Sequence, residues 1–135
     1  GASDAGAHLD FLATFNYSTY LLAAARDRGL LELESAVHKL TDVPARLYGL
    51  KDRGRIEEGW WADLVVFDAQ NVAPDEIEVR EDLPGGGWRL YSEAIGVHHV
   101  FINGEQAVED GAFTEARPGT LLRSGRDTEK ITANG

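Results

Sequence analysis

Residues 53–68 read Arg-Gly-Arg-Ile-Glu-Glu-Gly-Trp-Trp-Ala-Asp-Leu-Val-Val-Phe-Asp, and the local pattern changes here from helical to extended. The second part, residues 62–68, is a nearly continuous apolar run rich in β-branched side chains, which predicts a strand buried on both faces. The first part, residues 53–59, is bracketed by glycines and predicts a short strand and turn. The chain therefore divides near residue 50.

The residues before this stretch carry a helical pattern. A first helix has one apolar face, formed by Tyr20, Leu21, Ala24 and Ala25, and Gly29 stands where this helix would end. A second amphipathic helix repeats apolar residues at helical spacing, namely Leu33, Ala36, Val37 and Leu40. Pro44 cannot continue that helix but can start a new turn. We therefore expect a short third helix over residues 45–48, closed by Gly49.

The residues after position 68 alternate between surface segments and strands. Residues 69–87 are acidic and contain two prolines and three consecutive glycines, which predicts a surface excursion. Residues 97–102 predict a strand, and Asn103-Gly104 is the signal for a two-residue hairpin turn that returns through residues 106–108. From Thr114 onward the sequence predicts an extended surface strap. No internal repeat is present.

The composition narrows the class of protein. The chain has 135 residues, 43% of them hydrophobic, which suits one small soluble domain. Its 13 Lys and Arg face 23 Asp and Glu, and the resulting net charge of −10 argues against nucleic-acid binding. No apolar run approaches the roughly 20 residues of a membrane span. The absence of Cys excludes disulfides and thiol catalysis in these residues and fits a cytoplasmic location.

The opening of the chain predicts that it belongs to a longer protein. The sequence contains no Met, and residues 1–8 read Gly-Ala-Ser-Asp-Ala-Gly-Ala-His. This composition is typical of the interior of an active-site loop, and no secondary-structure element leads into it. We therefore expect a fragment whose missing part would lie upstream.

Three passages together resemble the amidohydrolase superfamily, and within it the branch of N-acyl-D-amino-acid deacylases. Residues 3–8 resemble the Ser-Asp loop after the last barrel strand of these enzymes. Residues 33–50 resemble the part of these enzymes in which a helix is followed by a Pro-Ala-x-x-x-Gly-Leu passage. Residues 53–68 resemble a run that is widespread in the accessory β domain of the superfamily and form the most specific of the three signals. The region from residue 97 to residue 119 is similar to the C-terminal hairpin and strap.

The resemblance implies an α/β fold and a reaction. Residues 1–50 would be the last loop and C-terminal helices of a (β/α)8 metal-dependent hydrolase barrel, and residues 51–135 a segment of its accessory β-sandwich domain with a surface strap. The reaction would be hydrolysis of a non-peptide C–N amide bond with zinc as cofactor. Asp4 would be a metal ligand, general base and proton shuttle, and Ser3 and His8 would contact the substrate.

Spacing alone leaves other interpretations of these residues open. Ser3-Asp4 is also typical of a helix cap or a turn, and His8 of an ordinary loop histidine. His38 lies on a charged helix face and is expected to be solvated. His98 and His99 are adjacent on a predicted strand and would face opposite sides, which argues against one shared metal ion.

The remaining polar residues favour structural roles. Asp63 and Asp68 bracket the predicted strand of residues 62–68, so we expect them to make turn or strand-end hydrogen bonds. Trp60, Trp61 and Trp88 favour core or domain packing. The acidic residues 75–82 predict a solvated surface.

Two alternatives stay open on the sequence. The resembled branch tends to carry a basic residue shortly after the Ser-Asp loop, whereas residues 9–20 contain no Arg or Lys, so a neutral acylamide or a cyclic amide is an alternative substrate. The parent would then resemble dihydroorotases and hydantoinases. The other alternative is a non-catalytic structural or interaction module.

The partners expected are a small-molecule amide and the missing N-terminal barrel portion, present as a companion chain or in the same polypeptide. The remaining histidine ligands of the family would lie in that portion, so we expect the isolated 135-residue chain to be inactive. Its apolar helix faces also predict self-association into a homo-oligomer.

Overall fold

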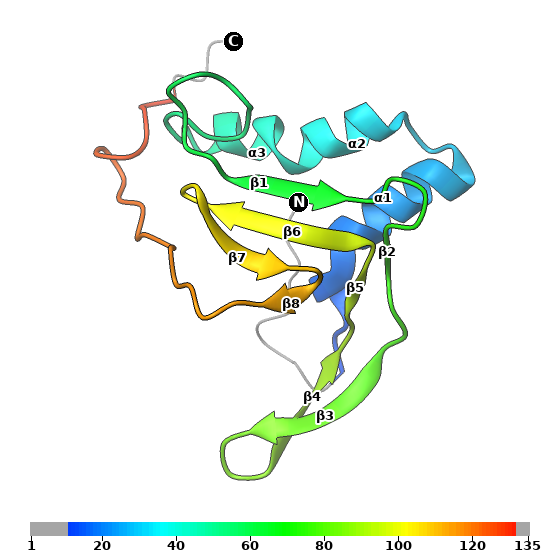
Figure 1. The fold of residues 1–135 in the computed structure, drawn as a ribbon. Coiled ribbons are helices and arrows are strands. Elements are labelled where there is room, and N and C mark those ends of the chain that lie inside the picture. Colours follow the sequence, from blue (N-terminus) through cyan, green and yellow to red (C-terminus); the bar gives the residue numbers. More distant parts are fainter. Residues whose placement is uncertain (1–10, 132–135) are drawn as a thin grey trace.

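The computed structural model describes residues 11–131, which form three helices, a short 3-10 turn and eight strands (Figure 1). The helical part comprises η1 (Thr14–Asn16), α1 (Tyr17–Arg28), α2 (Leu33–Leu40) and α3 (Asp42–Leu47). The strands are β1 (Leu64–Phe67), β2 (Ala73–Pro74), β3 (Glu78–Leu83), β4 (Gly87–Tyr91), β5 (Ala94–Ile95), β6 (Val97–Ile102), β7 (Glu105–Glu109) and β8 (Ala112–Phe113). Within the described residues they form an antiparallel sheet in the order β1-β6-β7-β8 and two further pairs, β2-β5 and β3-β4.

The first two helices exist as predicted, but Tyr20, assigned to the apolar face of the first helix, is 48% exposed. α1 ends at Gly29, whose φ of 58° and ψ of 32° lie in the left-handed region that glycine adopts without a Cβ penalty. α3 begins at Asp42, three residues before the predicted start at Ala45. Pro44 is tolerated there because backbone N–H groups in the first turn of a helix have no intrahelical acceptor.

The predicted short strand at residues 53–59 is wrong. The backbone turns instead, with positive φ values at Asp52 (55°), Gly54 (88°) and Gly59 (84°). A regular strand needs φ near −120° to −140°, so these three positions prevent one from forming. The glycine signal was therefore correct for turns and incorrect for the strand between them.

The strand predicted from the apolar run exists as β1, but the prediction that both its faces are buried is wrong. Val65 is 55% exposed and Val66 is 47% exposed. β1 lies at the edge of the four-stranded sheet and pairs with β6 on one side. The apolar run favours burial of both faces, but residues 11–131 leave Val65 and Val66 exposed.

The predicted hairpin at Asn103-Gly104 is confirmed. Both residues have positive φ, 53° and 84°, as the tight turns favoured in hairpins require. The turn connects β6 to β7, and the Gly104 N–H donates to the carbonyl of Ala62 at 3.0 Å. This last bond ties the turn to the residues that lead into β1.

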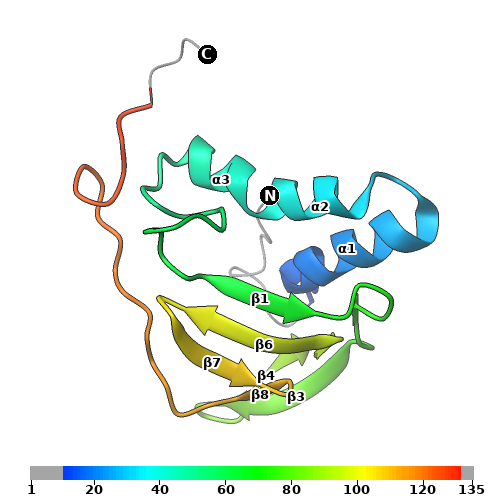
Figure 2. The same cartoon turned by 45° about the horizontal axis from the view of Figure 1, so that its top comes forward.

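The acidic segment after β1 contains regular structure that the sequence pattern did not reveal. It holds β2 and β3, and β3 pairs with β4 in a hairpin that projects from the body of the molecule (Figure 1). The chain after β8 runs as an extended strap up to the turn after α3 (Figure 2), as predicted. The Glu129 N–H donates to the Gly49 carbonyl at 2.7 Å, and Leu50 and Thr128 form an isolated bridge.

The core lies where α1 and α2 meet the segment after β1. Its buried residues are Leu22, Ala25, Ala36 and Val72, and the predicted helix stripe of Leu33, Val37 and Leu40 packs against them while staying partly exposed. Residues from both sides of position 50 therefore share one core. None of the helices in residues 11–131 has the length and apolar character needed to cross a membrane.

Candidate functional site

The sequence places its site candidates at the start of the chain. Ser3, Asp4 and His8 lie outside the described residues, so their catalytic, metal-binding and substrate-binding roles stay predictions. The described residues supply the framework that follows this loop in the chain. They show which other polar side chains already form hydrogen bonds or ion pairs.

Residues 11–131 contain no group of three or more His, Asp or Glu side chains that could hold a metal ion. The rings of His98 and His99 have centroids 6.4 Å apart and are tilted by 50°. Nδ1 of His99 lies 3.2 Å from the side-chain amide nitrogen of Gln106. His38 is exposed, as predicted, and its Nδ1 lies 3.5 Å from Asp42. A metal centre would need ligands from outside this part of the chain.

A buried carboxylate, Asp42, lies at the centre of a polar cluster. Both of its oxygens accept hydrogen bonds from Arg55, at 2.6 Å from Nε and 3.2 Å from Nη2. Arg46, one turn further along α3, adds an ion pair at 2.9 Å. The hydrogen bond to Asp42 raises the pKa of Arg55 above its ordinary value. Two guanidinium groups therefore bind the Asp42 carboxylate.

The Asp42 cluster lies at the wall of an open hollow of about 540 Å³ between α2, α3 and the turn at residues 54–56. Two lining carboxylates, Glu34 and Asp42, face two lining guanidinium groups, Arg46 and Arg55, so the formal charges cancel. Both oxygens of Asp42 already accept charge-assisted hydrogen bonds from Arg55, and Arg46 pairs with one of them. We assign the cluster a structural role.

Gly54 allows the turn to approach α3. Its φ is +88°, and a Cβ built at this position would lie 2.5 Å from the Cβ of Ala45. A side chain here would push the turn away from the helix, and with it Arg55. The ion pair between Arg55 and Asp42 therefore requires a glycine at position 54.

A second network joins the turn, β1, the β6-β7 hairpin and the strap. Arg53 forms an ion pair with Asp63 and donates to the side-chain oxygen of Asn103 at 2.6 Å. Asp63 accepts the Asn103 N–H at 2.9 Å, and the Asn103 amide donates to the Pro118 carbonyl at 2.6 Å. The Arg53 guanidinium lies 5.0 Å from the ring centroid of Trp61. The predicted strand-end role of Asp63 is confirmed.

Asp68 fixes the turn that follows β1. It accepts the Gln70 N–H at 2.8 Å and the Asn71 side-chain amide at 2.6 Å. These bonds, that from Asn71 first, hold the pKa of Asp68 below its ordinary value. The predicted turn-forming role of Asp68 is confirmed.

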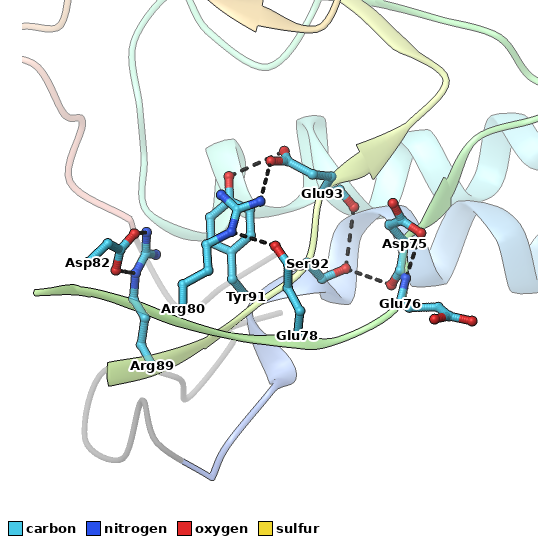
Figure 3. Close-up of polar contacts among 9 residues, drawn as sticks. All are labelled: Asp75, Glu76, Glu78, Arg80, Asp82, Arg89, Tyr91, Ser92 and Glu93. Carbon is cyan, nitrogen blue, oxygen red and sulfur yellow. Dashed lines mark hydrogen bonds and ion pairs between the residues drawn. The ribbon is translucent and has the colours of Figure 1, made fainter. Parts of the chain in front are cut away.

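The projecting hairpin carries an ion-paired face (Figure 3). The guanidinium groups of Arg80 and Arg89 lie 3.6 and 4.7 Å from the ring centroid of Tyr91. Arg80 donates to Glu78 at 2.5 Å and to Glu93 at 3.0 Å. The acidic surface is exposed, as predicted, and two of its carboxylates, Glu78 and Asp82, form ion pairs with arginines.

The other arginine of this face, Arg89, forms two hydrogen bonds with a single carboxylate. Arg89 donates to both oxygens of Asp82, at 2.8 and 2.6 Å. This bidentate pair lowers the pKa of Asp82 and raises that of Arg89. Asp82 and Arg89 therefore pair with each other across the two strands of the hairpin.

Comparison with known proteins identifies the chain. A family model described as the amidohydrolase family matches residues 2–108. The chain belongs to the amidohydrolase family. N-acyl-D-glutamate deacylase of Alcaligenes xylosoxydans xylosoxydans is 44% identical over 98 residues, which cover 73% of this chain and 18% of that protein. The predicted resemblance to the deacylase branch is confirmed.

Solved structures and a further relative extend the comparison. A D-aminoacylase structure, from work on the functional role of its binuclear metal centre, is 36% identical with a TM-score of 0.55, covering 73% of this chain and 19% of that one. A dihydroorotase of Archaeoglobus fulgidus is 31% identical over 98 residues, covering 71% of this chain and 23% of that protein. The amidohydrolase chain thus spans about a fifth of the length of these relatives.

Proposed function

We propose that this chain is the C-terminal portion of a metal-dependent amidohydrolase that cleaves the non-peptide C–N bond of an N-acyl-D-amino acid. One observation carries the proposal: the family match begins at residue 2, so it includes the Ser-Asp loop. The 44% identity to the deacylase relative supports the substrate class. In this proposal residues 1–50 complete a (β/α)8 barrel, and residues 51–135 complete an accessory β-sandwich domain.

Asp4 is the proposed base and proton shuttle. A carboxylate next to the reacting water accepts its proton and passes it to the leaving amine nitrogen. The sequence neighbours of Asp4 at positions 1–7 are all Gly, Ala or Ser, and these small residues support a substrate beside the carboxylate in this proposal. Ser3 and His8 are proposed to contact that substrate.

The binuclear metal centre of D-aminoacylase supports a metal cofactor, and zinc is the ion we propose. A bound divalent ion would polarise the scissile carbonyl and acidify its water. Within this chain Asp4 is the proposed ligand, and residues 11–131 offer no cluster to complete the coordination. The other ligands therefore have to come from the part of the enzyme outside these residues.

The test uses the whole enzyme that contains this sequence. Its metal content is measured, and hydrolysis is assayed on N-acetyl-D-glutamate, N-acetyl-D-leucine and their L enantiomers. We expect metal-dependent release of the free D-amino acid and little reaction with the L substrates. Hydrolysis of neither enantiomer by metal-loaded enzyme would overturn the substrate assignment.

A cyclic amide is the second candidate substrate. The similarity to dihydroorotase supports it. For a ring without a carboxylate, such as hydantoin, it is also supported by the absence of Arg and Lys from residues 9–20, where a substrate carboxylate would otherwise find a cation. Dihydroorotate and hydantoin are therefore assayed beside the acyl amino acids. Ring opening in the absence of deacylation would favour this alternative.

A further inference from the structure

We draw no further inference here: the strongest candidate, the exposed apolar face of the β3-β4 hairpin that carries Ile77, Val79 and Trp88, is unpartnered among the described residues, and nothing in the structure shows what covers it.

Discussion

Asp42 holds the turn at residues 54–56 against α3, because its two oxygens bind the guanidinium of Arg55 while Arg46 pairs with it from the same helix. Charge-assisted bonds to a buried group contribute more than exposed pairs, since water competes less for the partners. Arg46 and Arg55 are themselves partly exposed, which reduces that contribution.

Asp42→Asn should therefore destabilise the enzyme that contains this chain by about 2 kcal/mol, the usual order for losing a hydrogen-bonded charge with little loss of volume. The measurement is the urea midpoint of unfolding. Glu58→Gln, a neutralisation of an exposed carboxylate in the neighbouring turn, is the control and should leave the midpoint unchanged. Equal midpoints for the two variants would contradict the structural role of Asp42.

Alanine substitutions at two glycines distinguish the free-energy cost of backbone strain from that of a close contact. Gly29 and Gly54 both have positive φ, but a Cβ at Gly29 would meet nothing within 4 Å, whereas one at Gly54 would collide with Ala45. Gly29→Ala should cost about 1 kcal/mol for the left-handed backbone. Gly54→Ala should cost about 3 kcal/mol, because the contact adds to the strain.

The same urea midpoints test the glycine pair. The difference between the two variants measures the contact of the turn with α3. If Gly54→Ala costs no more than Gly29→Ala, the turn does not pack on the helix as described.

At the scale of elements, local signals predicted the structure wherever a local cause fixes it. The end of α1 at Gly29 and the turn at Asn103-Gly104 depend on backbone conformations that few residues adopt, so the sequence specifies them. The start of α3 was misplaced because Pro44 suits a first helical turn at its third position as well as at its beginning. The strand at residues 53–59 was wrong because the glycines there permit backbone angles that no strand contains.

Contacts between residues far apart in the chain could not be predicted from the sequence. Asp42 meets Arg55 across an irregular turn, and no periodicity relates the two positions. The β3-β4 hairpin was missed because its acidic residues are typical of a solvated segment. The sequence does not show that these residues form ion pairs with Arg80 and Arg89. The site itself rests on the resemblance of residues 3–8 to a family loop, because a Ser-Asp pair alone is also typical of a cap.

The hairpin gives a pH prediction with a definite sign. The pKa of Asp82 lies below its ordinary value of 3.8, chiefly because Arg89 donates to it. The ion pair therefore stabilises the hairpin fully above the ordinary pKa, and this stabilisation is lost as the pH falls through the lower, folded-state pKa.

Arg89→Gln should raise the pKa of Asp82 toward its ordinary value, as measured by NMR titration of the carboxyl carbon. Arg80→Gln is the matched control, because Arg80 pairs with Glu78 and Glu93 and affects Asp82 only weakly. If both variants shift Asp82 equally, the bidentate pair is not the cause.

At the scale of the whole molecule, the described residues bury little apolar surface. Their buried apolar residues are Leu22, Val72 and alanines at 24, 25, 36 and 45, whereas large side chains such as Ile56 and Phe113 are more than 80% exposed. Exposed apolar area on this scale marks surfaces that another part of a protein covers.

The isolated 135-residue chain should therefore associate with itself or bind the dye ANS strongly, and it should not hydrolyse acyl amino acids. Analytical ultracentrifugation, dye fluorescence and the amide assay check these outcomes. A folded, monodisperse and metal-free monomer would instead favour the alternative of a non-catalytic module. Hydrolysis by that monomer would contradict the need for ligands from the rest of the enzyme.

The most direct test of the account is the kcat of the whole metal-loaded enzyme for N-acyl-D-amino acids after Asp4→Asn. Loss of a general base typically costs 10²- to 10⁴-fold, so we predict that kcat falls by at least about 100-fold. Asp110→Asn is the control, because Asp110 is 87% exposed in a turn whose positive φ asparagine also adopts, and it should keep the parent kcat. An Asp4→Asn enzyme with the parent kcat would contradict the assignment of Asp4 as base and proton shuttle.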